Sequence, residues 1–528
     1  MLLIGLDIGT SGCKAAVFRE DGTLLTSANR EYAIEMPIPG WAEQDAEQVW
    51  RLAQDALREI LATLSQEMAC RERVAALSLS VQGEAIIPVD GAGRALRSAI
   101  LGMDTRTVAQ NAWLRERFDA ARLYARTGMP VHTVNTLPKL LWLQDHEPQT
   151  WASASHFLLY EDFLIQKMTG ERVVSRCLAS RTQLYDLRAD AWAAEILDVL
   201  ELSPSRLSEV QPAGVVIGRM RADLAADLGF SGSPLVVTGG HDQACGALGV
   251  GLTRPGLAMV STGTAEVVEL TLSAAKLDEV LGRGEGGDGG ARDSGRASLY
   301  QGNVSVYAHT APDLYLAMTL NHSGGLILRW YRDTFGRGAK REARVGSQDS
   351  DLDAYDLLLA EASPEPSPLL LLPHFAGSGT PSFDTASKGA LLGLTFATTK
   401  ADVVKAILEG LTFELRLNLD LLQGAGLAIT ELRAIGGGAR SELWLQLKAD
   451  ITGIPVVVPR VVDAACWGAA LLAGHGAGCF PSLHHAAVDT VALDRAFEPQ
   501  FDRQRRFAQR YQLYQELYPK LRSLLRRI

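Results

Sequence analysis

Three common catalytic motifs are missing from this sequence. It contains no GxxxxGK[ST] loop, no HExxH pair and no GxSxG turn. The first absence removes the main support for a P-loop ATPase, the second for a zinc protease and the third for a serine hydrolase. Catalysis by this chain would have to use another arrangement of residues.

Cysteine is also scarce and shows no metal-binding pattern. The six residues are scattered along the chain, at Cys13, Cys70, Cys177, Cys245, Cys466 and Cys479. No CxxC pair occurs, and no nearby histidine completes a zinc set. Such usage favours reduced thiols in an intracellular protein over a disulfide framework.

Hydrophobic runs long enough to cross a membrane are absent as well. The longest uncharged apolar stretch, 464–483, contains His475 and Pro481, so we expect a buried helix followed by a loop. The N-terminal MLLIGLDIGTSG has no basic residue and reaches Asp7 after a short apolar run, which is not typical of a signal peptide. We therefore expect a cytoplasmic protein with no membrane partner.

Length and composition indicate a multidomain globular protein. The chain has 528 residues, a length that exceeds what one hydrophobic core usually serves. Hydrophobic residues make up 47% of it and charged residues 21%, which is typical of a globular protein. We predict two domains, 1–250 and 251–528. The formal net charge of −10 argues against nucleic acid as the main partner.

Two stretches share one order of strands and turns. In residues 2–30, the runs LLIGLDI, CKAAVF and TLLTSA are separated by the turns GTSG and EDG. Near residue 257, LAMVS, the turn TGT and AEVVEL repeat this order, with ASLYQGNV (297–304) as the expected third strand. With the helical patterns between the apolar strands, this predicts a duplicated α/β fold.

The segment 282–295 is rich in glycine and charge, so we expect a mobile excursion. It contains GRGEGG, a literal GxGxxG, but no strand precedes this motif and no helix follows it. A dinucleotide site needs both, so the match is better explained as a coincidence of composition than as a nicotinamide site.

Two helices are predicted in the C-terminal half. Apolar residues recur at helical spacing over 402–423, and Thr399 with Asp402 forms a capping box. From Arg503 onward a basic segment carries an apolar stripe, at Phe507, Tyr511, Tyr514, Tyr518, Leu521 and Leu525. This segment is either a packed terminal helix with a solvated basic face, which we favour, or a helix for an anionic partner.

Two turns have the chemistry of phosphate binding. DIGTSG (7–12) places Asp7 at the end of a buried strand, followed by a turn of Gly, Thr and Ser whose N–H groups and hydroxyls can hold phosphate oxygens beside a magnesium ion. An ordinary hairpin turn is the alternative. The second turn, STGT (261–264), favours the functional interpretation, because two such turns in a duplicated fold would face each other across a cleft.

Two further motifs follow apolar runs. GGHDQ (239–243) places Asp242 at a strand end, where α/β proteins position reacting groups, although a helix N-cap is an alternative role. An aspartate there can accept the proton of a hydroxyl that attacks phosphorus. GGGARS (436–441) allows close approach of a flat ligand, and Ser441 can cap the next helix; a purely structural turn is the alternative.

These motifs, and above all GALLGLTFATTKADVVKAILEG (389–410), resemble the FGGY carbohydrate kinases, which include xylulose, fuculose, ribulose, gluconate and glycerol kinases. The resemblance runs from Leu3 to Leu521. It implies an α/β protein of two ribonuclease-H-like (actin-like) domains, with ATP and Mg²⁺ in the cleft between them. A homodimer is compatible with it.

The resemblance also implies a role for each motif residue. Asp242 would be the general base and Asp7 the metal ligand. ATP would be held by Gly9, Thr10, Ser11, Lys14, Thr262, Gly263, Thr264, Gly437, Gly438 and Ser441. The sugar would be held by Gln82, Glu84, Asp104, His241 and Gln243.

The residues of the sugar site depart from any one member of the family. Gln82-Gly83-Glu84-Ala85 stands where xylulose kinases have Gln-Met-His-Gly, and Glu84 matches the glutamate of glycerol kinases. Gly102 stands where a tryptophan is common, while His241 and the stretch 135–143 resemble fuculose kinases.

We expect a kinase for a ketopentose such as xylulose, with fuculose, ribulose, erythritol or glycerol as alternatives. A non-catalytic sugar-binding regulator is the alternative of another class. Glu84 is expected to accept hydrogen bonds from sugar hydroxyls, the alternative being a surface glutamate at a strand end.

Overall fold

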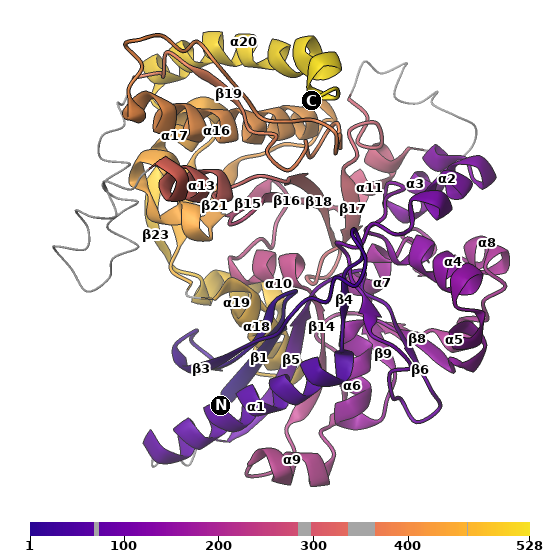
Figure 1. The fold of residues 1–528 in the computed structure, drawn as a ribbon. Helices are drawn as coiled ribbons and strands as arrows, with labels where there is room; N and C mark the ends of the chain where they lie inside the picture. The colour runs from indigo at the N-terminus through magenta and orange to yellow at the C-terminus, as the bar shows by residue number, and fades with distance from the viewer. Residues whose placement is uncertain (68–72, 283–296, 336–364, 462) are drawn as a thin grey trace.

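The computed structural model describes residues 1–67, 73–282, 297–335, 365–461 and 463–528, which form two lobes around two large β-sheets (Figure 1). Beyond Gly282, the glycine-rich segment 282–295 lies outside these residues. The helices named below are α1 (Ala46–Glu67), α3 (Ala120–Thr127), α4 (Thr136–His146), α6 (Tyr160–Thr169), α7 (Arg176–Arg181), α9 (Ala222–Leu228), α10 (Asp242–Gly249), α11 (Ala274–Leu281), α13 (Leu326–Phe335), α16 (Lys400–Gly424), α17 (Glu442–Thr452), α18 (Ala464–Gly476), α19 (Leu483–Thr490) and α20 (Phe501–Leu525).

Further elements connect these helices. They are α2 (Val108–Arg117), α5 (Pro148–Ser153), α8 (Ala194–Val199), two 3₁₀ turns at Pro204–Arg206 and Gly437–Arg440, and the strands β4 (Glu43–Gln44), β6 (Ile87–Val89), β7 (Ala99–Ile100), β8 (His156–Leu158), β9 (Val173–Ser175), β10 (Tyr185–Asp186), β11 (Ala191–Trp192), β12 (Glu209–Gln211), β19 (Leu370–Leu372) and β20 (Ala390–Leu392). These strands form five two-stranded sheets, β4-β7, β6-β8, β9-β12, β10-β11 and β19-β20.

The first sheet has six strands in the order β13-β14-β5-β1-β2-β3. They are β1 (Leu2–Ile8), β2 (Gly12–Arg19), β3 (Leu24–Glu31), β5 (Val74–Val81), β13 (Val216–Arg219) and β14 (Leu235–His241). β1, β2 and β3 form the predicted antiparallel meander, while β5 and β14 join it in parallel. The three parallel strands therefore end at the same edge of the sheet.

The second sheet repeats this arrangement, which confirms the predicted duplication. Its order is β17-β18-β16-β15-β21-β22-β23. The strands are β15 (Leu257–Thr262), β16 (Glu266–Ser273), β17 (Ser305–Ala308), β18 (Leu314–Asn321), β21 (Glu431–Ile435), β22 (Val456–Pro459) and β23 (Leu493–Phe497). β15, β16 and β18 take the places of β1, β2 and β3, and β21 and β22 those of β5 and β14.

The prediction for the third strand of this meander was wrong. Residues 297–304 form turns rather than a strand, and β18 pairs with β16 instead. The amide of Gly302 donates to the carbonyl of Ser298, and Asn303, whose φ is +52°, donates to the carbonyl of Tyr300. The Gly-Asn pair closes a turn that an extended strand could not contain.

Backbone contact between helices joins the two halves of the chain. α18 comes from the C-terminal half but packs against β1, β5, β14 and α10 (Figure 1). A Cβ at Gly468 would lie 1.8 Å from the carbonyl oxygen of Cys245, and one at Gly249 would lie 2.0 Å from that of Ala464. A Cβ at Gly5 of β1 would meet the carbonyl oxygen of Cys466 at 1.8 Å. Only glycine fits at these three positions.

The two predicted C-terminal helices are confirmed. α16 begins with the capping box of Thr399 and Asp402, and it is covered by α20. The ring of Phe413 lies 5.9 Å from that of Tyr511 and 5.2 Å from that of Tyr514. The apolar stripe of α20 is thus buried against α16, as a packed terminal helix requires.

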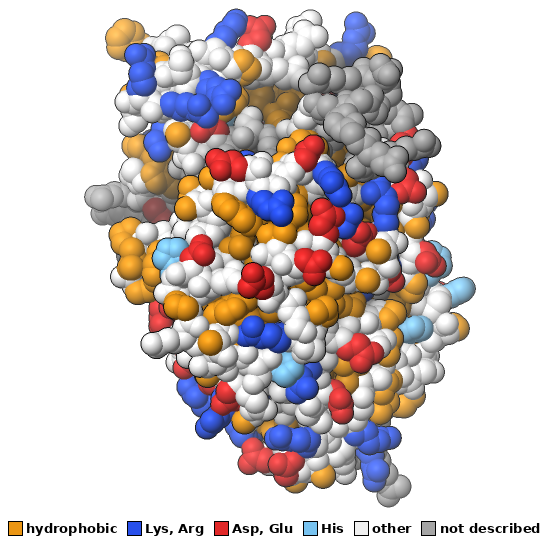
Figure 2. Space-filling model, turned by 90° about the vertical axis from the view of Figure 1, so that its right-hand side faces the viewer, with side chains coloured by type: hydrophobic (Ala, Val, Ile, Leu, Met, Phe, Trp, Pro, Cys, Tyr) orange, Lys and Arg blue, Asp and Glu red, His pale blue; other side chains and the backbone are white. Residues whose placement is uncertain are grey.

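The run 464–483 also folds as expected. Its first part is α18, buried from Cys466 to Gly474, and its second part is a loop up to Ser482. In the described part of the chain no helix has the length and apolarity that a membrane span needs. On the face shown in Figure 2, acidic and basic side chains are interspersed rather than segregated.

We predict that Gly468→Ala destabilises the protein by about 3 kcal/mol or more, because the added methyl group would force α10 and α18 apart. Helix propensity alone predicts the opposite sign, a stabilisation of about 1 kcal/mol. Thermal unfolding followed by circular dichroism measures the change. Gly232→Ala is the control, since nothing lies within 4 Å of its Cβ position. An unchanged melting temperature for Gly468→Ala would contradict the close contact.

Candidate active site

Three predicted segments meet at one edge of the first sheet. The turn 9–12 follows β1, Gln82 and Glu84 follow β5, and Asp242 follows β14. Since these three strands are parallel neighbours, their carboxyl ends place the segments side by side. Ligand sites of α/β proteins form at such edges.

The backbone of the turn 9–12 is fixed by hydrogen bonds that its carbonyl groups accept. Tyr32 Oη donates to the carbonyl of Gly9 at 2.7 Å, Gln44 Nε2 donates to that of Thr10 at 2.9 Å, and the amide of Tyr32 donates to that of Ser11 at 3.1 Å. Thr10 and Ser11 themselves are exposed. The turn therefore offers two hydroxyls to solvent on a fixed backbone.

Asp7 lies beneath this turn with few compensating contacts. Its Oδ1 accepts a hydrogen bond from Ser80 Oγ at 2.6 Å. Burial raises the pKa of Asp7 to about 6, and the nearby charge of Asp463 adds to the effect. Lys14 does not neutralise Asp7 directly, because its Nζ lies 2.5 Å from Asp463 Oδ2.

Asp242 is the first residue of α10, one position after the N-cap His241. Its Oδ1 accepts from the amide of Gln243 at 2.6 Å, and 29% of its side chain is exposed. Burial, followed by the like charge of Asp7, raises the pKa of Asp242 to about 7. The group is therefore a carboxylate poised to take a proton near neutral pH.

The second turn differs from the first in the use of its threonines. The Oγ1 of Thr262 donates to Glu266 Oε2 at 2.7 Å and accepts from Lys448 Nζ at 2.6 Å, all three residues being buried. This hydroxyl is engaged inside the second lobe. Gly263 and Thr264 are exposed. The prediction that this turn binds phosphate therefore depends on these two residues.

The glycine turn after β21 packs on the turn 261–264. Gly436 has a φ of +79°, and a Cβ at Gly438 would lie 2.8 Å from the Cβ of Thr262. Gly437 is exposed beside them, and Ser441 caps α17 by accepting from the amide of Trp444 at 3.2 Å. The predicted capping role of Ser441 is confirmed, and the predicted adenosine contacts stay a prediction.

Glu84 is buried, so the alternative of a surface glutamate was wrong. Its Oε1 accepts from Arg181 Nε at 2.6 Å, and its carbonyl accepts from Lys139 Nζ at 2.9 Å. With a φ of +60°, it also has a backbone conformation that is unusual for glutamate. A Cβ at Gly102 would lie 3.3 Å from Glu84 Oε2, so the small residue at 102 leaves this oxygen uncovered on that side.

The remaining predicted sugar ligands lie nearby and are largely engaged. Asp104 is fully buried, accepting from the amide of Ala42 at 2.6 Å and from Arg106 Nη2 at 2.7 Å. Gln82 Nε2 donates to Gln44 Oε1 at 3.0 Å. The Oε1 of Gln243 is buried and has no hydrogen-bond partner in the described part of the protein. A bound hydroxyl would satisfy it.

The family comparison decides the identity of this arrangement. The model of the N-terminal domain of the FGGY family of carbohydrate kinases matches residues 2–249, and that of its C-terminal domain matches residues 258–477. The chain belongs to the FGGY carbohydrate kinase family. It is therefore a carbohydrate kinase, and kinases of this family use ATP.

Full-length relatives are found for this FGGY kinase. It is 28% identical to the xylulose kinase of Escherichia coli K12 over 525 residues, covering 99% of this chain and 100% of the relative. It is 28% identical to a xylulose kinase of Staphylococcus epidermidis over 523 residues, 99% of this chain and 97% of the relative. A gluconokinase of Bacillus subtilis is 26% identical over 486 residues, 91% and 88% of the two chains.

Solved structures agree with the two-domain actin-like fold. A "xyloylose kinase" from Brucella ovis superposes with a TM-score of 0.85 at 29% identity, covering 99% of this chain and 100% of the other. A xylulose kinase from Rhodospirillum rubrum gives 0.83 at 26% identity, with the same coverage.

Four features of this kinase site escaped the sequence analysis. Arg181 pairs with Glu84, Ser80 with Asp7 and Asp463 with Lys14, and each partner is far away in the chain. Before α13, the amide of Gly325 donates to the carbonyl of Gly263 at 2.8 Å. Only this last feature had a signal in the sequence, the Gly-Gly pair that opens a helix.

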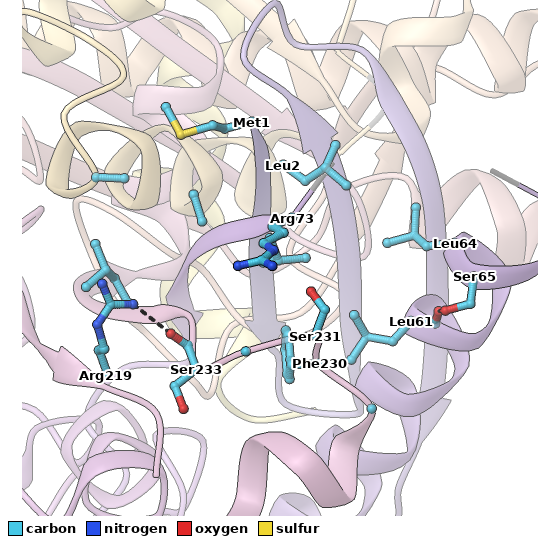
Figure 3. Close-up of a pocket in the computed structure, with 16 residues that line it drawn as sticks. Met1, Leu2, Leu61, Leu64, Ser65, Arg73, Arg219, Phe230, Ser231 and Ser233 are labelled. Carbon is cyan, nitrogen blue, oxygen red and sulfur yellow. Dashed lines mark hydrogen bonds between the residues drawn. The ribbon is translucent and has the colours of Figure 1, made fainter. Parts of the chain in front are cut away.

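A separate hollow of about 740 Å³ lies away from these groups (Figure 3). It is lined by Leu2, Val74 and Leu235, at the starts of β1, β5 and β14, and by Arg73 and Arg219. The proposed site lies where the same strands end. The hollow is thus not part of the active site.

The two threonines of the second turn should respond differently to loss of the hydroxyl. Thr262→Val should lower stability by about 1–3 kcal/mol, because Glu266 and Lys448 lose a buried hydrogen-bond partner. Thr264→Val should leave the melting temperature unchanged and raise KM for ATP several-fold. Thermal unfolding and ATP kinetics on both variants test this. The reverse pattern would show that the Thr262 hydroxyl serves ATP.

Proposed function

We propose that this FGGY kinase transfers the γ-phosphoryl group of ATP to a terminal hydroxyl of a ketopentose such as xylulose. The observation that supports this most directly is Asp242, a carboxylate with a pKa raised to about 7 beside the first phosphate turn and Glu84. Xylulose kinases among the full-length relatives support the choice of sugar.

The charges of the site favour a neutral sugar over a sugar acid. Asp7, Asp242 and Glu84 are acidic, and the pKa of Asp242 is raised by burial first and then by the charges of Asp7 and Glu84. The buried guanidinium of Arg181 is already paired with Glu84. A substrate carboxylate would be repelled by these three acidic groups. This argues against gluconate, although gluconokinases are among the relatives.

The proposed reaction begins with the sugar bound at the ends of β5 and β14. Asp242 accepts the proton of the terminal hydroxyl as that oxygen attacks the γ-phosphorus of ATP. The new bond joins the sugar oxygen to phosphorus, and the bond between the γ-phosphorus and its bridging oxygen breaks, so that ADP leaves with the electron pair. The two turns hold the phosphates in line.

The residues present fit a magnesium ion at Asp7. Carboxylate oxygen is the ligand that Mg²⁺ prefers, and the pKa of Asp7 is raised mainly by burial, while the nearby Lys14 is paired with Asp463. No group of three or more His, Cys, Asp and Glu side chains suited to a metal occurs in the described ranges. This suits Mg²⁺, which keeps water and phosphate oxygens as further ligands. When bound, the ion would neutralise phosphate charge.

We place the domain boundary at 250/251, between α10 and β15, with the ATP cleft between domains 1–250 and 251–528. We also propose a cytoplasmic enzyme. The five described cysteines are free thiols, which supports a reducing compartment.

The proposal predicts that Asp242→Asn lowers kcat by at least about 10³-fold, because a general base typically raises the rate by about 10²–10⁴-fold. The affinity for ATP should change less than about 2-fold. ADP release with a panel of ketoses, polyols and gluconate, and calorimetry with ATP, measure both. We expect turnover with a ketopentose and none with gluconate. Full activity of the variant would remove Asp242 from the mechanism.

A pH profile gives a second test. Asp242 must be ionised to accept a proton, and its pKa is raised to about 7, so kcat/KM for the sugar should fall about tenfold per pH unit below 7. The profile is measured from pH 5 to 9 at saturating ATP. A flat profile down to pH 5 would mean that Asp242 ionises in its ordinary range.

A further inference from the structure

At Gly83, between Gln82 and Glu84, a neighbouring side chain leaves no space for a Cβ atom. Its φ is not in the positive range, so the backbone does not require glycine. A Cβ at this position would lie 2.6 Å from Cδ2 and 2.8 Å from Nε2 of His241. Real Cβ atoms essentially never approach so closely. The space that a side chain at 83 would take is filled by the imidazole.

The imidazole of His241 also contacts the proposed base. Its side chain is 7% exposed, and its Nε2 lies 3.3 Å from Asp242 Oδ1. The ring packs edge-on against Tyr307 of β17, with centroids 5.7 Å apart. Burial and the charge of Arg181 lower the pKa of His241 well below its usual value, so the ring is neutral. A neutral ring is thus wedged between Gly83, Tyr307 and Asp242.

We propose that Gly83 and His241 form a matched pair in which the imidazole positions Asp242 for proton transfer, and Gly83 provides the space that this requires. The proposal rests on the proposed function, with His241 as a positioning residue.

Gly102 serves as a contrast. A Cβ there would lie 3.3 Å from Glu84 Oε2, 3.5 Å from the carbonyl oxygen of Gly83 and 3.6 Å from Val134. An added Cβ at 102 would narrow the space around Glu84, and none of the three atoms nearest to it belongs to His241.

A double-mutant cycle tests the pair. Gly83→Ala should lower the single-turnover rate of phosphoryl transfer about tenfold or more, because the ring must move away from Asp242. In the His241→Ala background the same substitution should cost less than about 2-fold, since the obstructing ring is gone. KM for ATP should not change in any variant. Equal losses from Gly83→Ala in both backgrounds would overturn the proposal.

Gly102→Ala is the matched control. We expect it to raise KM for the sugar several-fold with a smaller change in kcat. His241→Ala should not relieve its effect, because the atom nearest to the added methyl group is Glu84 Oε2 rather than an atom of His241. Relief of Gly102→Ala by His241→Ala would contradict a specific pair.

Folding of the variants is read independently. If Gly83→Ala is too unstable for kinetics, the cycle is read from melting temperatures, where the double variant should match His241→Ala within about 2 °C. A double variant that is as unstable as Gly83→Ala alone would overturn the pair. Loss of activity in Asp242→Asn is a separate result, so failure of the matched pair and failure of the proposed function are distinguishable.

Discussion

Backbone contact between α10 and α18 determines where Asp242 lies. Gly249 and Gly468 let the two helices touch without side chains between them, and Gly5 brings β1 against α18 in the same way. Asp242 is the first residue of α10, and Asp463, which holds Lys14, is the N-cap of α18. The proposed general base and the partner of Lys14 therefore lie at the starts of two helices in direct contact.

Some charged groups of this site are neutralised by a buried partner, and others are not. Arg181 and Lys448 are buried and paired with Glu84 and Glu266, and breaking such pairs leaves an uncompensated charge. Arg181 also lies 4.6 Å from the ring centroid of Tyr307, a residue of the second sheet. The proposed sugar side of the site is thus linked across the two lobes. Asp7 and Asp242, by contrast, keep raised pKa values because burial is only partly compensated.

Local patterns were sufficient to predict most of the fold. The alternation of apolar residues predicted the meanders, and side-chain spacing predicted the caps at Thr399 and Ser441. The error at 297–304 arose because apolar residues around Gly302 suggest a strand, while the Gly-Asn turn prevents one.

Side-chain partners far apart in the sequence could not be predicted in the same way. Nothing next to Glu84 indicates that Arg181, 97 residues later, takes one of its oxygens. Likewise the TGT motif gives no sign that Lys448 engages the hydroxyl of Thr262. Such contacts follow from the packing of whole elements, and only the three-dimensional structure contains that information.

The position of α18 has a consequence for how the chain is made. Residues of β1 alternate between two faces, Leu2, Ile4 and Leu6 belonging to the core that includes α1, and Leu3 to the core that includes α18. During synthesis from the N-terminus, the face that carries Leu3 and Gly5 stays uncovered until residues 464–476 have left the ribosome. The first lobe therefore completes its folding late, although most of its strands are made early. Until α18 is synthesised, the apolar face that carries Leu3 must be shielded from water by other contacts.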